Sequence, residues 1–236
     1  MPAEGGDAVI WMRPERAATG RPARHTRDEI TLAAMAIADR EGLDAVSMRR
    51  VAADLGTGAA SLYRYLETRE DLLDLMTDAA GAEYVLAAPT GDWLADLLGI
   101  GEQALAIMRR HPWLPSLVVT RSVLGPHGLV LLEHVLEALA DHPASTATKL
   151  DAFGLLNAST ALFVLNELSG GAARQQRNAA YLQHALASGR HGRLAELLAP
   201  SAAAETLLTA SAHKPADRYR DIAARILSGL LAESDS

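Results

Sequence analysis

The apolar residues of positions 26–86 recur at three- and four-residue intervals, which places them on one face of an α-helix. This spacing predicts helices over residues 26–42, 47–56, 58–66 and 69–86. Thr26 and Ser47 stand at the first two starts and are residue types that cap helix N-termini. Gly42 and Gly56 stand at the corresponding ends, where glycine commonly stops a helix. A short Gly-containing turn between two helices, the second of them small, is typical of a helix-turn-helix.

The chain after Pro89 keeps the helical spacing and becomes more apolar. The predicted helices cover residues 91–110, 116–125, 126–142, 147–176 and 215–233. Pro112 and Pro115 interrupt the series, because proline removes a backbone donor and clashes inside a helix. Residues 170–213 are rich in Gly, Ala and Ser and indicate only short helical pieces. No segment alternates as a strand would, so the predicted fold class is all-α.

Composition narrows the classes of function. The 236 residues include no cysteine, which excludes disulfides, thiolate metal sites and cysteine nucleophiles. Aromatic residues make up only 4%, and the apolar content is mainly Ala and Leu, which favours helices. No apolar run reaches the roughly 18 residues that a membrane-spanning helix needs, and residues 1–12 lack the features of a secretory signal. We therefore expect a cytoplasmic protein with no membrane partner.

Charge is unevenly distributed along the chain. The net charge is −7, which by itself argues against nucleic acid. Between Arg13 and Arg27, however, five arginines stand against one acid. Residues 1–25 are interpreted as a flexible basic arm that can seek phosphate, or alternatively as a solvated tail without a role. Nothing before Met12 is expected to be structured, so Met12 is a candidate start of translation.

The stretches "AMAIADREGLDAVSMRRVAADLG" and "GAASLYRYLETREDLLDLM" carry a more specific signal. Together they resemble, in one register, the DNA-binding domain of Tet-repressor-family transcriptional regulators. The proline-containing stretches "RRHPWLP" and "LGPHGL" resemble those of the family branch nearest the tetracycline repressor. The resemblance implies a helix-turn-helix domain over residues 26–76. It also implies a larger helical domain for ligand binding and dimerisation over residues 77–236.

The short third helix has the properties of a DNA-reading helix. A major groove about 12 Å wide admits one helix, and small residues such as Ala59, Ala60 and Ser61 let the backbone come close. Tyr63 and Arg64 have polar ends that can reach backbone oxygens or a neighbouring base. The predicted DNA-binding residues are Ser47, Met48, Arg49, Ala59, Ala60, Ser61, Tyr63, Arg64, Tyr65 and Arg69.

The resemblance implies roles for several of these residues. Arg49 is the best candidate for reading guanine, while Tyr63 and Arg69 align with residues that contact phosphate. Tyr65 aligns with a residue that either bonds the DNA backbone or packs inward. Ala59 stands where family members often read a base with an amide, so polar reading there is lost. The alternative for both tyrosines is ordinary helix packing.

The resemblance also implies a ligand pocket between the middle helices. The candidate pocket residues are Trp93, Met108, His111, Trp113, His127, His134, Phe153, Asn157, Phe163 and Glu167, each of which could instead be core or surface. His127 and His134 lie seven apart without a third ligand at metal spacing, so no metal and no cofactor is expected. The last two long helices carry more apolar residues than one buried stripe needs, which indicates either dimerisation or a larger core. The candidate interface residues are Leu155, Ala158, Leu162, Leu165, Ile222, Ile226 and Leu230.

The predicted function is a ligand-responsive transcriptional repressor. It would bind a near-palindromic double-stranded operator as a homodimer and leave it on binding a small-molecule inducer. The chain has no Gly-x-Ser-x-Gly, His-Glu-x-x-His or phosphate-loop motif, so an enzyme is not expected. The alternative is a helical ligand-binding or scaffolding protein that no longer binds DNA.

Overall fold

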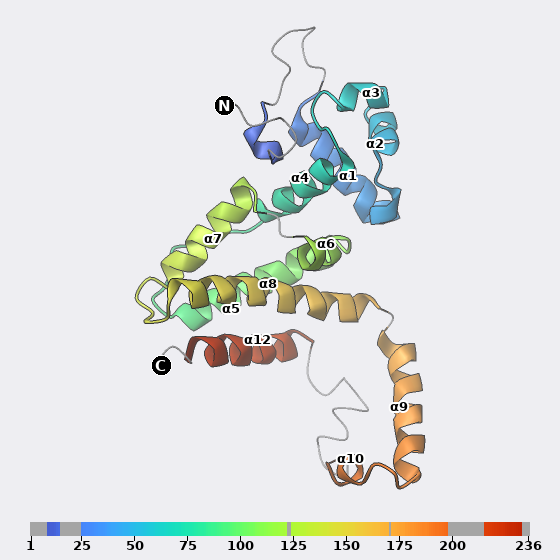
Figure 1. Ribbon diagram of the computed structural model, residues 1–236, viewed down its shortest axis with the longest axis vertical. Helices are drawn as coiled ribbons and strands as arrows, with labels where there is room; N and C mark the ends of the chain where they lie inside the picture. The colour runs from blue at the N-terminus through green and yellow to red at the C-terminus, as the bar shows by residue number, and fades with distance from the viewer. Residues whose placement is uncertain (1–8, 15–24, 122–123, 170, 198–214, 233–236) are drawn as a thin grey trace, which may run out of the picture.

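The computed structural model describes residues 9–14, 25–121, 124–169, 171–197 and 215–232. Over these residues the secondary structure is helical and no strand occurs, so the predicted all-α class is confirmed (Figure 1). The elements are η1 (Ile10–Met12), α1 (Arg27–Glu41), η2 (Leu43–Ala45), α2 (Met48–Asp54), α3 (Ala59–Leu62), α4 (Arg69–Gly81), α5 (Trp93–Arg110), α6 (Leu114–Thr120), α7 (Pro126–Ala138), α8 (Thr146–Leu168), α9 (Gly171–Ala187), α10 (Gly192–Leu197) and α12 (Pro215–Ala232). Of the helices formed by the described residues, none is long and apolar enough to cross a membrane.

The N-terminal helices begin on side-chain caps. Thr26 Oγ1 accepts a hydrogen bond from the backbone N–H of Glu29 at 3.1 Å, and Glu29 Oε2 accepts from the N–H of Thr26 at 3.0 Å. The same reciprocal pair, between Thr68 and Asp71, starts α4. Ser47 Oγ caps α2. These bonds satisfy backbone donors that a helix start would otherwise leave without partners, so the chain enters each helix at a fixed residue.

The third helix is shorter than predicted. The sequence predicts a helix as far as Leu66, but α3 ends at Leu62 and a turn follows. Both leucines are buried, because the turn bends the chain back onto its own domain. The next backbone N–H groups, those of Glu67 and Thr68, donate to Asp71 at the start of α4 rather than to a continuing helix.

The fourth helix also ends before the predicted residue 86. It stops at Gly81, and the backbone then runs without regular structure toward α5. The side chain of Gln103 on α5 holds this connection through both backbone groups of Val85. Its Oε1 accepts from the N–H of Val85 at 2.8 Å, and its Nε2 donates to the carbonyl at 3.2 Å. A side chain thus replaces the helical partners of Val85.

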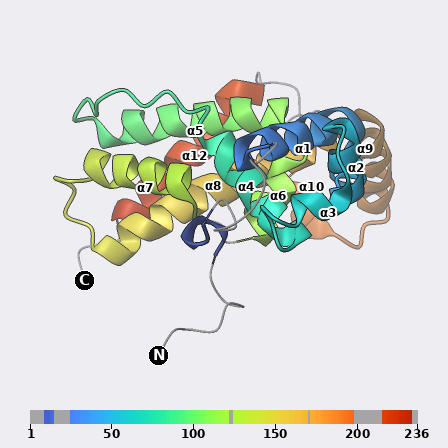
Figure 2. The same ribbon diagram turned by 90° about the horizontal axis from the view of Figure 1, so that it is seen from above.

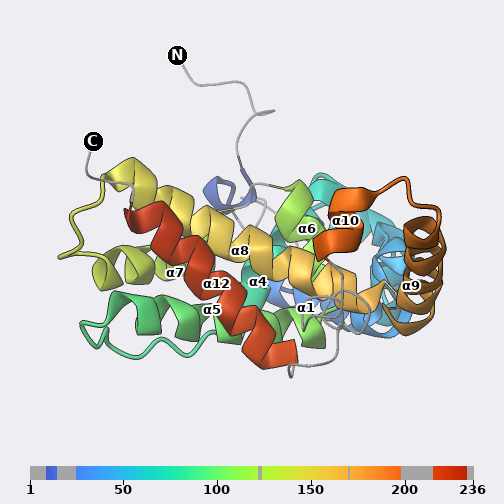
Figure 3. The same ribbon diagram turned by 90° about the horizontal axis from the view of Figure 1, so that it is seen from below.

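The larger domain is built of stacked helices. Helix α8 packs against α5, α6 and α12, and α12 lies across α8 and α5 (Figure 3). Helix α7 packs on α4, α5 and α8. Helices α2 and α3 lie at the end of the molecule away from α7 (Figure 2). The sequence predicts α6 over residues 116–125, whereas it covers Leu114–Thr120 with Pro115 in its first turn, where proline is tolerated.

The long helix predicted over residues 147–176 is two helices. Helix α8 ends at Leu168, and α9 begins at Gly171 and runs in a different direction (Figure 1). Two adjacent glycines occupy positions 170 and 171 in the sequence. Glycine costs about 1 kcal/mol relative to alanine inside a helix, so this pair is a weak point in an otherwise continuous apolar pattern.

The first described residues belong to the folded part of the molecule. Residues 10–12 form a 3₁₀ helix, and Ile10 is 1% exposed. For residues 9–14 the expectation of a flexible arm is therefore wrong, as is the expectation that nothing before Met12 is structured. The apolar run of residues 8–12 is too short to show a helical period, so it gives no clear sequence signal of burial. The rest of the expected arm, residues 1–8 and 15–24, lies outside the described residues.

Candidate nucleic-acid interface and ligand pocket

The turn between α2 and α3 is formed by the glycines that the sequence pointed to. Gly56 has a φ of 63°, in the left-handed region that favours glycine. Ser61 Oγ donates to the carbonyl of Gly58 at 2.7 Å and shares a hydrogen bond of 2.8 Å with Thr57 Oγ1. Ser47 Oγ accepts from the N–H of Arg50 at 3.2 Å. In this structure both predicted DNA-binding serines hold their own backbone, and each remains partly exposed.

Two of the predicted DNA-binding residues are buried. Met48 is 6% exposed and Tyr65 is 8% exposed, and both belong to the hydrophobic core. The Tyr65 hydroxyl accepts from the backbone N–H of His25 at 3.4 Å. Their side chains are therefore not available to DNA here, and inward packing is the arrangement adopted by Tyr65. The helical spacing of Met48 with Val51 and Ala52, also buried, was the sequence signal for this.

The remaining residues form an exposed polar face around α3. Tyr63 is 53% exposed, and Arg49, Arg64 and Ala60 are also exposed, while Ala59 is partly buried. Among the described residues, the guanidinium groups of Arg49 and Arg64 have no hydrogen-bond or ion-pair partner. Two exposed guanidinium groups and a phenol thus project beside a turn lined with small residues, a combination suited to phosphate and base edges.

Arg69 lies at the edge of this face but serves the fold. Its Nε donates to the carbonyl of Val46 at 3.0 Å, and its Nη2 donates to the carbonyl of Leu43 at 3.3 Å. It thereby fixes the connection between α1 and α2 to the start of α4. The residue remains exposed, so its charge stays at the surface. Any contact of Arg69 with phosphate would come in addition to this bracing role.

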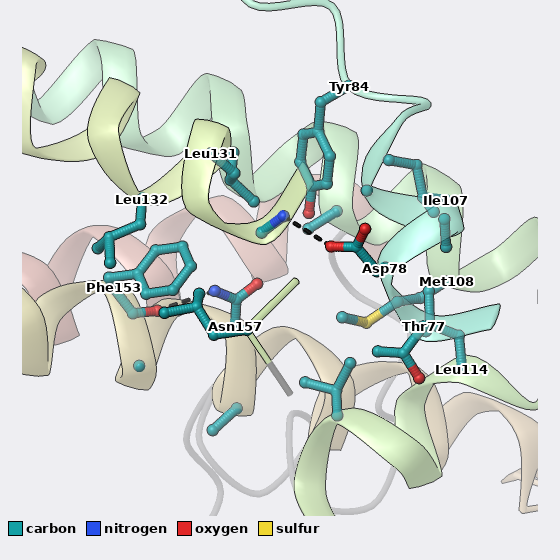
Figure 4. A pocket seen from close by; sticks show the side chains of 18 of the residues that line it. Thr77, Asp78, Tyr84, Ile107, Met108, Leu114, Leu131, Leu132, Phe153 and Asn157 are labelled. Carbon is teal, nitrogen blue, oxygen red and sulfur yellow. Dashed lines mark hydrogen bonds between the residues drawn. The ribbon is translucent and has the colours of Figure 1, made fainter. Parts of the chain in front are cut away.

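A cavity of about 410 Å³ lies between α4, α5, α6, α7 and α8 (Figure 4). Its walls are mostly aliphatic and aromatic. Of the ten candidate pocket residues, Met108, Phe153 and Asn157 line this cavity. Cavities of this size, apolar with a few polar groups, are typical of sites for small organic molecules.

Two neutral polar groups point into the cavity (Figure 4). The Tyr84 hydroxyl has no hydrogen-bond partner among the described residues, and burial raises the pKa of this phenol. Asn157 Nδ2 donates to the carbonyl of Phe153 at 3.0 Å, and its Oδ1 is left without a partner among the described residues. The site therefore offers a neutral hydroxyl and a carboxamide oxygen to a bound molecule.

The charged residues of the cavity wall are already paired. Asp78 is buried and accepts from the backbone N–H groups of His127 and Gly128 at 3.3 and 3.0 Å. The Arg121 guanidinium pairs with Glu70 and Asp74 of α4, with an Nε–Oδ1 distance of 3.2 Å to Asp74. Both groups thus tie other elements to α4. A charged ligand would have to compete with these bonds.

Seven of the candidate pocket residues do not line this cavity. These residues are Trp93, His111, Trp113, His127, His134, Phe163 and Glu167. Trp93 packs edge-on against His142 with ring centroids 5.1 Å apart, and Phe163 packs against Tyr219 at 5.5 Å. Glu167 pairs with Arg109 at 2.7 Å.

His127 and His134 share helix α7. Nδ1 of His127 lies 3.0 Å from Asp78, and His134 is partly buried without lining the cavity. Among the described residues, no group of three His, Cys, Asp or Glu side chains is arranged to hold a metal ion.

His111 and Trp113 join the two domains. Nδ1 of His111 lies 2.8 Å from Oδ1 of Asp39 on α1, and its Nε2 lies 2.6 Å from Oε1 of Glu83. Trp113 Nε1 donates to the same Asp39 oxygen at 2.6 Å. Burial would raise the pKa of Glu83, but hydrogen bonds from Arg110 and His111 hold it below its ordinary value. This cluster is structural, and it ties α1 to the end of α5.

The cavity residues that sequence reasoning missed include Tyr84, Asp78 and Arg121. Tyr84 follows the end of α4 in a segment that the sequence predicts to be helical, so its direction could not be read from spacing. Asp78 and Arg121 resemble ordinary surface charges in the sequence. Only the packing of α6 and α7 onto α4 turns them toward the cavity.

Comparisons with known proteins agree with this architecture. Residues 30–76 match the family described as "Bacterial regulatory proteins, tetR family", and residues 87–214 match "Tetracyclin repressor-like, C-terminal domain". DrrR1, an HTH-type transcriptional repressor of Streptomyces coeruleorubidus, is 43% identical over 130 residues, which cover 54% of this chain and 48% of DrrR1. The chain thus spans about half the length of that relative. An HTH-type transcriptional regulator of Saccharopolyspora erythraea is 32% identical over 194 residues, which cover 82% of this chain and 80% of that protein.

Solved structures of ActR from Streptomyces coelicolor have a similar fold. The complex of ActR with actinorhodin has a TM-score of 0.75 and 27% identity, covering 91% of this chain and all of that one. The complex with (S)-DNPA has a TM-score of 0.74 and 28% identity, covering 90% of this chain and all of that one. The helix-turn-helix and the larger helical domain both match one family of regulators, which is not a family of enzymes. The chain belongs to the TetR family of bacterial transcriptional regulators.

Proposed function

We propose that this protein is a cytoplasmic repressor that binds a near-palindromic operator as a homodimer and releases it when a small molecule occupies the cavity. One observation carries the proposal: a single helix, α4, starts beside the exposed face around α3 and also forms a wall of the cavity. A ligand that favours one position of α4 therefore changes the position of α2 and α3, here called the reading head, to the extent that it binds the two positions of α4 with different affinity.

DNA binding can be tested without knowing the operator. Random duplexes are selected with the purified protein, and binding to the selected duplex is compared with an unselected one over a range of salt concentrations. We expect a salt-sensitive complex and a two-fold related consensus. A protein that selects no sequence would be a ligand-binding or scaffolding protein instead.

The cavity favours a specific ligand class, a largely apolar molecule with neutral hydrogen-bonding groups such as carbonyls and hydroxyls. Its walls are apolar, Tyr84 and Asn157 are its unpaired polar groups among the described residues, and its charges are already paired. The relative ActR has been crystallised with actinorhodin and with (S)-DNPA, and actinorhodin is therefore a suitable first probe.

The ligand class is tested by calorimetric titration with actinorhodin. Tyr84→Phe is expected to weaken binding by about 1 kcal/mol, the net value of one hydrogen bond, and Asn157→Leu by a similar amount. Tyr181→Phe is the matched control, because Tyr181 is exposed on α9 away from the cavity. Equal affinity of all four proteins would remove both polar groups from ligand recognition.

Dimerisation is proposed through α8 and α12. These helices pack on each other and carry exposed apolar side chains on their outer faces, among them Leu155, Leu162 and Ile222. The other predicted interface residues are less available. Leu165, Ile226 and Leu230 are partly buried, and Ala158 lines the cavity. A dimer would remove the exposed leucines from water and place two reading heads on one operator.

Sedimentation equilibrium distinguishes a dimer from a monomer. The wild-type chain is expected to be a dimer, and Leu162→Glu combined with Ile222→Glu is expected to give a folded monomer. Leu32→Glu is the matched control, since Leu32 is exposed on α1. A wild-type monomer at micromolar concentration would exclude this mode of binding to a palindrome.

A further inference from the structure

Residues 9–14, here called the N-terminal strap, contact both domains of the molecule. Helix η1 of the strap packs against α4 (Figure 1), and Ile10 is part of the hydrophobic core. Trp11 is partly buried against the same core. The strap therefore has fixed contacts, each of which can be followed to the reading head or to the ligand cavity.

One guanidinium group joins the strap to the reading head. Arg27, the first residue of α1, donates from Nη1 to the carbonyls of Ile10 and Arg13 at 3.1 and 2.9 Å. Its Nη2 donates to the carbonyl of Pro14 at 3.1 Å. Its Nε donates to the carbonyl of Tyr65 at 3.1 Å, just beyond α3. A displacement of the strap therefore acts through Arg27 on the turn that follows α3.

A second guanidinium group holds the start of α4. Arg13 pairs with Glu67 at 2.8 Å and with Asp71. Asp71 also accepts from the backbone N–H groups of Glu67 and Thr68 at 2.9 and 3.0 Å. Burial would raise the pKa of Asp71, but the Arg13 guanidinium and these backbone donors hold it below its ordinary value. The strap thus takes part in the cap that sets where α4 begins.

The other side of the strap touches the wall of the ligand cavity. A Cβ atom built at Gly125, the N-cap of α7, would overlap both Cζ2 of Trp11 and Cγ of Asp78. The indole, the Gly125 backbone and the Asp78 carboxylate are therefore in close contact. Asp78 lines the cavity and binds the first turn of α7, and the neighbouring Leu124 and Gly128 also line it.

We propose that the N-terminal strap is a second connection, besides α4, between the ligand cavity and the DNA-reading head. Trp11 is the positioning residue that follows the start of α7, and Arg13 is the one that holds the start of α4. A ligand that shifts α7 against α4 changes the packing under Trp11, and the strap passes this change to Tyr65 through Arg27. The inference rests on the proposed function, because it concerns how ligand occupancy reaches DNA binding.

Because the ligand is unidentified, the test disturbs the contact between the strap and α7 with an added methyl group. Gly125→Ala places a Cβ against both the indole of Trp11 and the carboxylate of Asp78, so both side chains must move. We expect Gly125→Ala to weaken binding to a selected operator by about tenfold, within the range of measured couplings. Trp11→Phe removes the ring edge that carries Cζ2 but keeps an aromatic ring in the strap. In that background only the overlap with Asp78 remains, so Gly125→Ala is expected to cost less, about threefold.

Two further measurements keep the result interpretable. Gly99→Ala is the matched control on α5, because a Cβ there meets nothing within 4 Å, and operator affinity is expected to stay at the wild-type value. Hydrogen exchange needs no DNA: Gly125→Ala should speed exchange of the Glu67 and Thr68 amides, and Trp11→Phe should reverse this.

The outcomes separate the two proposals. Equal losses in both Trp11 backgrounds, with exchange at the start of α4 unchanged, would show that Gly125 acts only through Asp78 and would overturn the role of the strap. In that case the wild-type protein still binds its operator, and the proposed function stands. A wild-type protein that selects no operator would overturn both.

Discussion

The arginines near the reading head differ in what already binds them. Arg50 pairs with Glu41 at 2.7 Å and also with Asp54, and Arg69 donates to two backbone carbonyls. Arg49 and Arg64 have no such partner within the described residues. A paired cation must give up existing bonds to bind DNA, whereas an unpaired exposed one gives up only water. DNA recognition should therefore depend most on Arg49 and Arg64.

Arg49→Ala is expected to cost about 1–3 kcal/mol of affinity for the operator, and less for random duplex. Arg50→Ala is the matched comparison one residue away and is expected to cost less, because Arg50 is held by Glu41. Fluorescence anisotropy with both duplexes gives the two losses. Equal losses of Arg49→Ala on operator and random DNA would make Arg49 a phosphate contact without a role in specificity.

Asp71 gives the stability of the protein a defined dependence on pH. Its pKa is lowered in the folded state, so it contributes stability at pH values above its ordinary pKa of about 3.9. That contribution is lost as the pH falls through the lower, folded-state value. Urea unfolding between pH 5 and pH 3 should therefore show a smaller loss of stability in Asp71→Asn than in the wild type. An identical pH dependence of the two proteins would contradict this.

At the scale of the element, α5 carries two glycines that differ in their surroundings. A Cβ at Gly101 would overlap the hydroxyl of Tyr219 and meet Leu156 at 3.0 Å, whereas a Cβ at Gly99 meets nothing within 4 Å. The Tyr219 hydroxyl also lies 2.7 Å from Thr160 Oγ1, so it cannot move without loss. Gly101 is therefore the point where α12 approaches α5 closely.

Gly101→Ala is expected to lower the free energy of unfolding by about 1–3 kcal/mol, the usual cost of overpacking. Gly99→Ala is expected to raise it by about 0.4–1 kcal/mol, since alanine favours the helix and no atom is displaced. Urea denaturation of the two variants gives the comparison. A destabilised Gly99→Ala would mean that helix propensity does not control stability at this position.

Most helices could be predicted from the sequence, because their spacing, caps and glycine stops are local. Thr26, Ser47 and Gly42 fix boundaries that the structure reproduces. The errors arise where a distant contact decides. Gln103 takes over the backbone of Val85 beyond α4, and residues 9–14 are held by Arg27 and Asp71. No local pattern announces such partners.

The same contrast between local patterns and distant contacts applies to the two candidate sites. The exposed face around α3 depends on one short stretch, and there only Met48 and Tyr65 proved buried. The cavity is lined by five helices, so its residues depend on how α6 and α7 pack onto α4. The sequence therefore identified Met108, Phe153 and Asn157 as pocket residues. It also assigned His111 to the pocket, although His111 contacts Asp39 at the junction of the two domains.

At the scale of the whole molecule, an acidic protein must approach a polyanion. The net charge is −7, and the segment of residues 15–24 carries Arg16, Arg21 and Arg24 against Glu15. Replacing these three arginines by Gln leaves residues 9–14 and Arg27 intact, so the strap keeps its bonds. It should weaken operator binding and reduce the slope of log K against log salt by about 0.9 for each phosphate that the variant no longer neutralises. Anisotropy titrations at several salt concentrations measure the slope, and an unchanged slope would leave this segment without a role in binding.

The bonds of Arg27 have one more consequence. Arg27 begins α1, and its guanidinium also binds the carbonyl of Pro14. Pro14 and Arg27, which flank the segment of residues 15–24, are therefore held together. The ends of a closed excursion stay together whatever its sequence, and doubling its length costs only about 0.6 kcal/mol in closure entropy. An epitope inserted in this segment would lengthen the connection without removing a hydrogen bond between Arg27 and Ile10, Arg13 or Pro14. The chain thus offers a position for a fluorescent reporter that leaves the bonds of Arg27 to the strap in place.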